Sequence, residues 1–269
     1  MTAAEHADLL ELMEAMTEIA ADAAAAIQNR GAGNGVRTKA DGSPVTAADE
    51  ASDEVILAGL SQIAATVPIV SEEHADHERE AIGERASYFL VDPLDGTREF
   101  IAGRDEYTVN IALVSNGAPV IGVIVAPARN LAWRGAAGHG AERLAIVDGK
   151  LSGAQPIHTR QCSTDDPVIM VSRSHLEPNT RLFLERFPKA RLVQCGSSIK
   201  FCHIAEGVAD LYPRLSPTRD WDIAAGHAIL MAAGGRVAAR DGGRLVYGTP
   251  ERTIPGFIAW GGTSTHVTG

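Results

Sequence analysis

Apolar and polar positions near the N-terminus repeat with the period of an α-helix. Spacings of three and four predict an amphipathic helix over residues 3–28, with these apolar side chains directed inward: Leu9, Leu12, Met16, Ile19, Ala23 and Ile27. A Gly-rich loop follows at residues 31–35. The same spacing predicts a second helix over residues 46–63, which directs Val55, Ile56 and Leu60 inward.

Short apolar runs bounded by turn residues predict strands in the next part of the chain. They lie at residues 68–70, 88–91, 107–114 and 119–125. Asn116-Gly117 separates the last two runs, which is the sequence of a two-residue β-hairpin turn. Residues 74–86 are polar and acidic, so we expect a mobile excursion there, and a short helix is expected at 99–102.

Beyond residue 160, strand patterns alternate with helix patterns. Strands are expected at 168–172, 192–195, 210–212 and 256–260, and helices at 179–187, 199–207 and 221–233. This alternation predicts a layered α/β protein with two intimate lobes. The lobes are expected to comprise residues 1–160 and 161–269.

The composition is that of an ordinary globular protein, with 45% apolar residues in a chain of 269. A formal net charge of −10 disfavours nucleic-acid polymers and anionic membranes as partners, but it allows a small anionic substrate beside a bound metal. Cys162, Cys195 and Cys202 include no CxxC pair, which predicts reduced thiols and a cytoplasmic setting. The N-terminus lacks an export signal, and the longest apolar run, 119–128, is too short to span a membrane.

The hexapeptide Asp92-Pro93-Leu94-Asp95-Gly96-Thr97 carries the most chemical information. It follows the apolar run 88–91, so we expect a rigid turn at the end of a buried strand, fixed by Pro93 and bent at Gly96. Two carboxylates in one turn repel each other unless a cation lies between them, and Mg²⁺ prefers oxygen ligands. The alternative is a purely structural turn, because these residue types are common in turns.

Four further segments suit the same chemistry, and each has a structural alternative. Glu72-Glu73 follows a predicted strand and would otherwise be a solvated acidic loop. Asp222 opens a predicted helix, where an acid also favours the helix dipole. Residues 46–49 fit a capping box. Gly196-Ser197-Ser198-Ile199-Lys200 opens another helix, where backbone N–H groups and the Lys200 ammonium suit a phosphate, although short Gly-Ser turns are common.

These acids together predict two adjacent divalent cations, with Asp92 bridging them. The further ligands would be Glu72, Asp95 and Asp222. Paired metals about 3.5–4 Å apart clamp the attacking and leaving oxygens of a phosphoryl displacement. A neighbouring carboxylate and hydroxyl, Asp49 with Thr97, would orient a water for in-line attack.

With these motifs the sequence resembles the lithium-sensitive, magnesium-dependent phosphatases of the inositol monophosphatase-like superfamily, over nearly the whole chain. The motif at 92–97 and Trp-Asp-Ile-Ala-Ala-Gly at 221–226 are highly specific for that superfamily. Softer motifs, above all 172–175 and 211–214, are similar to the bacterial 3′(2′),5′-bisphosphate nucleotidases within it. The other matching segments are 39–49, 71–73, 107–113, 196–202 and 205–207.

The resemblance implies an αβαβα sandwich of the inositol monophosphatase and fructose-1,6-bisphosphatase type, and it implies the metal ligands. One magnesium ion would be held by Glu72, Asp92 and the carbonyl of Leu94, and a second by Asp92, Asp95 and Asp222. Some members hold a third, weaker ion.

The resemblance also implies the substrate contacts. Gly96 and Thr97 would bind the scissile phosphate through backbone N–H groups, beside the metal-ligating Glu72, Leu94, Asp95 and Asp222, and Asp49 with Thr97 would activate the water. The rest of the nucleotide would be bound by His175, Ser197, Lys200 and Arg214.

The implied activity removes the 3′-phosphate of adenosine 3′,5′-bisphosphate to give AMP, in sulfate assimilation; some members also accept the 5′-phosphosulfate form. The nearest alternative is an inositol monophosphatase, or another sugar-phosphate phosphatase, with the same metal centre. Lys200 and Arg214 favour a bisphosphate, because it needs an additional cationic contact. Some members lie on the cytoplasmic face of the inner membrane. The choice between monomer and homodimer stays open.

Two other classes fit less well. Phosphatases of the haloacid dehalogenase type need two acids two residues apart, whereas Asp92 and Asp95 are three apart. A calcium-binding EF-hand, as in a sensing module, needs acids at loop positions that Leu94 and Gly96 occupy here. His74, where the bisphosphate nucleotidases often have an acid, is expected to have little effect on metal binding.

Overall fold

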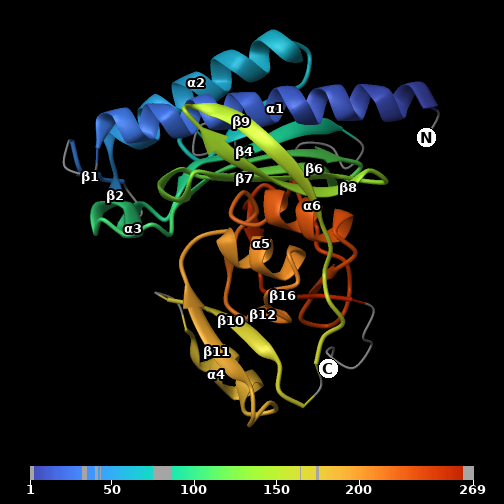
Figure 1. Ribbon diagram of the computed structural model, residues 1–269. Helices are drawn as coiled ribbons and strands as arrows, with labels where there is room; N and C mark the ends of the chain where they lie inside the picture. Colours follow the sequence, from blue (N-terminus) through green and yellow to red (C-terminus); the bar gives the residue numbers. More distant parts are fainter. Residues whose placement is uncertain are drawn as a thin grey trace.

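The computed structural model describes residues 3–31, 35–39, 42, 44–74, 86–163, 165–173 and 176–262. These residues form five layers, in which three layers of helices alternate with two sheets (Figure 1). The predicted αβαβα sandwich is therefore confirmed. Three short elements lie in the connections: β1 (Arg37–Thr38), β2 (Pro44–Val45) and η1 (Pro127–Arg129).

The first layer consists of α1 (Ala3–Arg30) and α2 (Ala47–Ile63), close to their predicted bounds. α1 buries Met16, Ala20 and Ile27 completely. Gly59 of α2 lies so close to Ile19 that an added Cβ would come within 2.7 Å of that side chain. Small residues thus let the two helices pack closely against each other above the sheet.

The second layer is a seven-stranded sheet in the order β3-β4-β5-β6-β7-β8-β9, antiparallel except for the β3–β4 pair. Its strands are β3 (Ile69–Ser71), β4 (Ser87–Asp95), β5 (Thr108–Ser115), β6 (Ala118–Ala126), β7 (Leu131–Ala136), β8 (Gly140–Val147) and β9 (Lys150–Ile157). Asn116 and Gly117 form the predicted hairpin turn, with φ values of 51° and 72°. Positive φ at both positions is what a type I′ turn requires.

Strand β4 is an almost unbroken apolar run because helices cover both faces of this sheet. Phe89 and Val91 pack with α1 and α2, whereas Tyr88 and Leu90 pack on the opposite side with the next helix layer. Side chains alternate along a strand, so Asp92 shares the face of Tyr88 and Leu90. The motif thereby directs its first carboxylate into the region between the two sheets.

The middle layer consists of α5 (Ile199–Ala205) and α6 (Ala224–Ala232). At Gly122 of β6 an added Cβ would lie 2.2 Å from the carbonyl oxygen of Ala225, and at Gly226 it would lie 2.4 Å from the Phe201 ring. α6 therefore packs directly on β6. This close packing fixes the start of α6 and, with it, the preceding loop that contains Asp222.

The five-stranded sheet has the order β11-β10-β12-β16-β14, and α4 (Pro178–Leu184) packs against its outer face through Phe183. Its strands are β10 (Val168–Ser172), β11 (Arg191–Cys195), β12 (Leu211–Arg214), β14 (Arg236–Ala239) and β16 (Phe257–Trp260). A separate ribbon pairs β13 (Thr218–Arg219) with β15 (Thr253–Ile254). The short helix α3 (Thr97–Ile101) follows β4.

Several predicted elements differ from the structure. The helix expected at 179–187 ends at Leu184, since Pro188 disfavours helical backbone before it. The helix expected from residue 221 begins only at Ala224, so Asp222 lies before the helix and not in its first turn. Strands β7, β8 and β9 were not predicted; β9 is mostly exposed and lacks apolar alternation.

Two predictions stay untested. The lobe boundary near residue 160 lies between the two sheets, yet the region between them is filled by the shared helix layer (Figure 1). The two-lobe division therefore remains a prediction. The excursion expected at 74–86 falls almost entirely on residues 75–85, which lie outside the described part of the chain.

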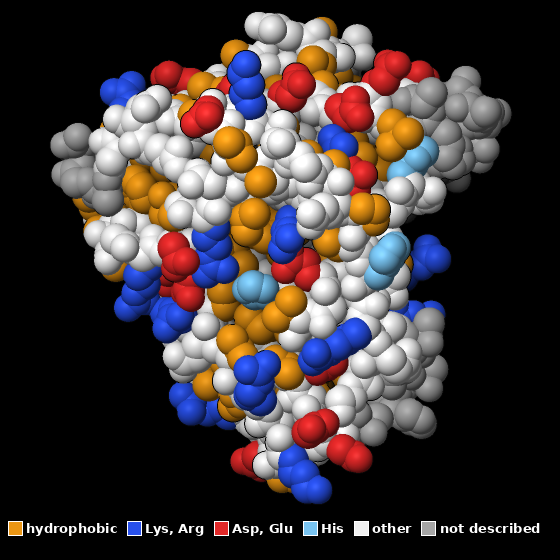
Figure 2. Space-filling view, viewed as in Figure 1, with side chains coloured by type: hydrophobic (Ala, Val, Ile, Leu, Met, Phe, Trp, Pro, Cys, Tyr) orange, Lys and Arg blue, Asp and Glu red, His pale blue; other side chains and the backbone are white. Residues whose placement is uncertain are grey.

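All three cysteines are buried, and none of them forms a disulfide. On the face shown in Figure 2, acidic side chains gather over the layer of α1, and both signs of charge intermix over the lower layers. Among the described helices, none is long and apolar enough to cross a membrane.

Candidate active site

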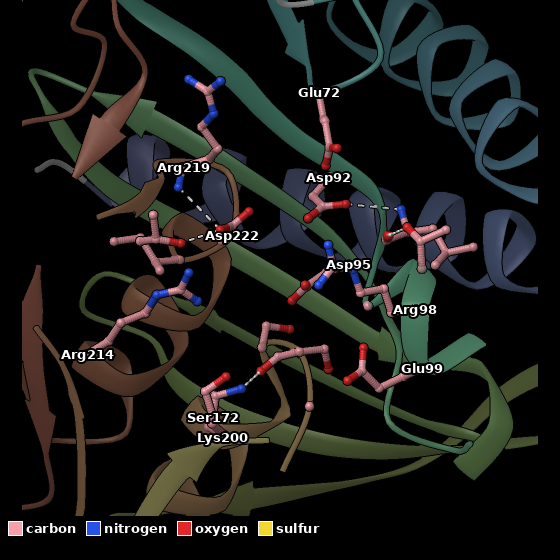
Figure 3. A pocket seen from close by; sticks show the side chains of 18 of the residues that line it. Glu72, Asp92, Asp95, Arg98, Glu99, Ser172, Lys200, Arg214, Arg219 and Asp222 are labelled. Carbon is pink, nitrogen blue, oxygen red and sulfur yellow. Dashed lines mark hydrogen bonds between the residues drawn. The ribbon is translucent and has the colours of Figure 1, made fainter. Parts of the chain in front are cut away.

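One cavity of about 460 Å³ brings together nearly all of the predicted site residues (Figure 3). It lies where β3 and β4 end and where α3, α5 and α6 begin. The predicted residues that line it are Glu72, Asp92, Leu94, Asp95, Gly96, Thr97, Ser197, Lys200, Arg214 and Asp222. His175 lies outside the described residues, and Asp49 does not line the cavity.

Residues Asp92 to Asp95 of the hexapeptide lie inside β4, and only Gly96 and Thr97 follow it, which corrects the predicted turn after the strand. Asp92 pairs with Asn110 of β5 and Asp95 with Thr108, and the register shifts between them. Such a bulge redirects side chains along a strand. Pro93 donates no ladder hydrogen bond, and its carbonyl instead accepts one from the Ser52 hydroxyl at 2.7 Å. Both carboxylates of the motif thus reach the same cavity.

Gly96 ends the motif in the left-handed conformation, with φ of 92°, and caps α3. A side chain there would be strained, and its Cβ would lie 3.0 Å from the carbonyl oxygen of Glu106. α3 therefore starts at Thr97, which lines the cavity, and the first N–H groups of the helix have no partner within it.

The carboxylates repel one another in this buried setting. Burial raises the pKa of Asp92 well above its usual range, and the charges of Glu72, Asp95 and Asp222 raise it further. Burial, together with Asp222, raises the pKa of Asp95 to about 7. Burial also raises the pKa of Glu72 to about 7, against the opposing attraction of Lys39. A cation is required if all of these groups are to be ionised together.

Lys39 supplies one positive charge to this cluster. Its ammonium donates to Glu72 Oε1 and to Glu73 Oε1, each at 2.7 Å. Burial works against the charged form, but the two glutamates outweigh it and raise the pKa of Lys39. Lys39 lies directly after β1, so the β1–β2 hairpin contributes to the site, which the sequence analysis did not foresee.

The donor set fits magnesium in chemistry. Glu72, Asp92, Asp95 and Asp222, which line the cavity, offer carboxylate oxygens, the ligands that a hard divalent cation prefers. Within the described residues, no three His, Cys, Asp or Glu side chains are arranged here as the ligand set of one ion. Several of these oxygens instead accept hydrogen bonds from protein groups, namely Lys39 on Glu72, Leu94 N–H on Asp92 and the Thr218 hydroxyl on Asp222.

Asp49 and Thr97 are in contact, as their predicted partnership requires. The Thr97 hydroxyl donates to Asp49 Oδ1 at 3.2 Å, while Thr46 N–H and its hydroxyl donate to Asp49 Oδ2 at 2.8 and 2.6 Å. Thr46 also caps α2 in the predicted capping box. Asp49 therefore serves both the cap and Thr97, and only Thr97 reaches the cavity.

Positive charge lies across the cavity from the carboxylates (Figure 3). Arg214 of β12 points toward Asp95 and Asp222, and its Nε is buried without a hydrogen-bond partner. Lys200 is less available than predicted, because its ammonium donates to the carbonyls of Cys195 and Ser197 and lies 5.1 Å from the Tyr212 ring centre. Arg214 is therefore the better placed cation.

The loop before α5, at Gly196 to Ser198, is strained and is held in place by hydrogen bonds to β5. Ser197 has a φ of 46°, rare for a non-glycine residue, and its buried hydroxyl lacks a partner in the cavity wall. The Ser198 hydroxyl donates to Asn110 Oδ1 at 2.7 Å and lies 2.8 Å from the Thr108 hydroxyl. Because these two residues are the β5 partners of Asp92 and Asp95, Ser198 ties the loop to the carboxylate strand.

Sequence reasoning missed Arg98 and Arg219, which also line the cavity. Arg98 directly follows the hexapeptide, and Arg219 lies two residues before the tryptophan of the second motif. The one feature of the sequence that could have indicated these two arginines is that each lies next to a motif. His74 is not idle either: its Nε2 lies 2.8 Å from Asp53 Oδ2, which links the loop after Glu72 to α2.

Comparison with known proteins decides the family. The model of the inositol monophosphatase family matches residues 8–259. The chain belongs to the inositol monophosphatase family. Among its relatives, the 3′(2′),5′-bisphosphate nucleotidase CysQ of Escherichia coli K12 is 42% identical over 224 residues, which are 82% of this chain and 87% of that protein. The CysQ of Buchnera aphidicola is 40% identical over 217 residues, 81% and 79% of the two chains.

Solved structures of this family have the same fold. The crystal structure of CysQ from Bacteroides thetaiotaomicron has a TM-score of 0.79 and 34% identity, and the match covers 94% of this chain and 98% of that one. An inositol monophosphatase from Anabaena has a TM-score of 0.73 and 26% identity, with coverage of 94% and 92%.

Proposed function

We propose that this chain is a magnesium-dependent phosphatase that removes the 3′-phosphate of adenosine 3′,5′-bisphosphate to give AMP. One observation carries the proposal: the carboxylates of Glu72, Asp92, Asp95 and Asp222 line a single cavity together with the side chain of Arg214. The likeness to CysQ, a 3′(2′),5′-bisphosphate nucleotidase by name, supports the choice of substrate. The 5′-phosphosulfate form of the nucleotide is a further substrate in this proposal.

Two magnesium ions would be held by the carboxylates of Glu72, Asp92, Asp95 and Asp222 and by the carbonyl of Leu94. Bound there, they would neutralise the developing charge and lower the pKa of a bound water. The mutual repulsion of Asp92, Asp95 and Glu72 supports this assignment, because cations would relieve it. Lys39 would give up its hydrogen bond to Glu72 when an ion takes that oxygen.

The residues of α3 and α2 would handle the reacting phosphate and the water. The N–H groups of Gly96 and Thr97 would bind the phosphate at the start of α3, where the helix dipole also favours an anion. The Thr97 hydroxyl would accept a hydrogen bond from the attacking water. As the Thr97 hydroxyl takes a proton from the water, it would pass its own proton to Asp49 Oδ1, which lies 3.2 Å away, so Asp49 acts through Thr97.

The second phosphate of the nucleotide would be bound on the opposite wall. Arg214 supplies a guanidinium that suits a phosphate, and the unpartnered Ser197 hydroxyl supplies a donor. Lys200 would act mainly by shaping the loop, because its ammonium holds the carbonyls of Cys195 and Ser197. A monophosphorylated polyol would place no second phosphate beside Arg214.

Phosphate release by the purified protein tests the proposal, with adenosine 3′,5′-bisphosphate and inositol 1-phosphate compared side by side in magnesium. We expect kcat/KM for the nucleotide to exceed that for the inositol phosphate by about ten- to a hundredfold, because one charged hydrogen-bonded contact contributes about 1.5–3 kcal/mol. A preference for inositol 1-phosphate would keep the metal site and refute the nucleotide. No hydrolysis of either ester would refute the phosphatase.

A further inference from the structure

A buried arginine lies outside the residues assigned above. Arg252 immediately precedes β15 and is only 3% exposed, although arginine is almost never fully buried without compensation. Its backbone has a φ of 49°, which is uncommon for a residue other than glycine. A strained backbone conformation persists only where the surrounding contacts hold it in place, so we examined what holds Arg252.

The backbone of Arg252 anchors the ribbon that holds Asp222. Its carbonyl accepts a hydrogen bond from Asp220 N–H at 3.0 Å, directly beyond the β13–β15 ladder. On β13, the Thr218 hydroxyl and the Arg219 N–H both donate to Asp222 Oδ2, the latter at 3.2 Å. The orientation of the Asp222 carboxylate therefore depends on where this ribbon lies.

The side chain of Arg252 reaches the other half of the site. Its guanidinium carbon lies 5.9 Å from the ring centre of Tyr88, within the range of a cation–π contact. Tyr88 belongs to β4 and lies four residues before Asp92 on the same face. Asp220, 1% exposed, attracts Arg252 electrostatically within the same buried region. One residue thus joins the ribbon of Asp222 to the strand of Asp92.

We propose that Arg252 is a positioning residue that sets the Asp222 carboxylate at the correct separation from Asp92 for metal binding. The inference rests on the proposed function, because it assumes that both aspartates hold metal. Arg252 contacts neither substrate nor metal in this proposal. It acts through the ribbon on one side and through the Tyr88 ring on the other.

Direct metal binding tests the proposal, with Mn²⁺ titrated calorimetrically into the full chain. Arg252→Ala is expected to weaken Mn²⁺ binding at least about tenfold, the usual effect of removing a group that orients a metal ligand. Arg252→Lys keeps the cation but loses the planar guanidinium, so its affinity for Mn²⁺ should lie between that of Arg252→Ala and that of the native chain. Arg244→Ala, at an exposed arginine, is the control and should bind Mn²⁺ like the native chain.

A second pair of variants keeps the test decisive if Arg252→Ala fails to fold. Tyr88→Phe retains the ring and should bind Mn²⁺ within about twofold of the native chain, whereas Tyr88→Leu removes it and should weaken binding about as much as Arg252→Ala. Native Mn²⁺ affinity in Tyr88→Leu and in every folded Arg252 variant, even with a lower Tm, would overturn the positioning role alone. A native chain that neither binds Mn²⁺ nor releases phosphate would overturn the proposed function and this inference with it.

Discussion

At the scale of single residues, three of the proposed metal-binding carboxylates, those of Glu72, Asp92 and Asp222, already accept a hydrogen bond from the protein. Asp92 accepts a hydrogen bond from Leu94 N–H at 3.1 Å, and Glu72 accepts one from Lys39. These contacts keep the carboxylates ordered, but they do not cancel the repulsion that raises the pKa of Asp92. The site is therefore held in place at a cost in stability that a cation would remove.

Asp92→Asn tests that balance. The amide keeps the shape of the side chain but removes one of the repelling charges, so the metal-free variant should unfold at the same Tm as the native chain or a higher one. Its turnover should fall by at least about a thousandfold, because Asp92 is proposed to bridge two ions. Thermal unfolding with and without magnesium, and phosphate release, measure both effects. Near-native turnover would refute the bridging assignment.

The proposed roles of Arg214 and Lys200 can be distinguished by comparing substrates with and without a second phosphate. Arg214→Ala should raise KM for adenosine 3′,5′-bisphosphate by about ten- to a hundredfold, because a charge-assisted contact is worth roughly 1.5–3 kcal/mol. For a nucleoside 3′-monophosphate, which lacks the second phosphate, KM should change little. Lys200→Ala should affect both esters alike, since its ammonium holds backbone carbonyls. A selective effect at Lys200 instead would return the second phosphate to that residue.

At the scale of elements, the site depends on how strands and loops are tied together. Ser198 hydrogen-bonds to Asn110 and lies beside Thr108, and these two residues of β5 pair with Asp92 and Asp95 of β4. A single hydroxyl thus joins the loop that would bind the nucleotide to β5, the strand that pairs with the proposed metal-binding strand. Glu106 reinforces the same loop by accepting a hydrogen bond from Gly196 N–H at 2.9 Å.

Ser198→Ala should therefore weaken substrate binding without removing any direct contact. Loss of the hydroxyl leaves Asn110 and Thr108 unsatisfied in a buried place, which costs about 1–3 kcal/mol. We expect a lower Tm together with a rise in KM of about tenfold. Ser87→Ala provides the matched control, because it removes an exposed hydroxyl contact of 2.9 Å to Ser115 on the same pair of strands. Equal KM values in both variants would contradict the coupling.

Elements with regular patterns were predictable from sequence, and those set by tertiary packing were not. The helix over residues 3–28 and the Asn116-Gly117 hairpin follow from periodicity and turn chemistry. Strand β9 was not predicted because its side chains are mostly exposed. The bulge of β4 was not predicted because only the pairing with β5 reveals it. Likewise, the hexapeptide pattern indicated Asp92 and Asp95 as site residues. Lys39 and Arg252 come close to the site only through the tertiary fold, which no local sequence pattern specifies.

At the scale of the whole molecule, the proposed ligands come from distant parts of the sequence. Glu72 directly follows β3, and Asp92 and Asp95 belong to β4. Asp222 precedes α6 and accepts a hydrogen bond from Thr218 of the β13–β15 ribbon. Metal binding would therefore join elements from both ends of the chain. A ligand that binds only the folded state stabilises it by mass action, by roughly 2.7 kcal/mol at a hundred times its Kd.

The stability of the metal-free protein should consequently depend on pH in an unusual direction. Glu72 has a pKa of about 7 in the folded state against 4.5 ordinarily, so the folded protein binds more protons than the unfolded chain between these values. Stability from this group therefore falls as pH rises from about 4.5 to 7 and stays low above that range. Asp95, with a pKa also raised to about 7, acts in the same direction.

Thermal unfolding in a chelator should show Tm falling across this pH range. Magnesium should restore more stability at pH 8 than at pH 5, since ionised carboxylates bind it. In Asp95→Asn the fall should be smaller, and a Tm of the native chain that rises with pH in the chelator would contradict the buried, repelling cluster.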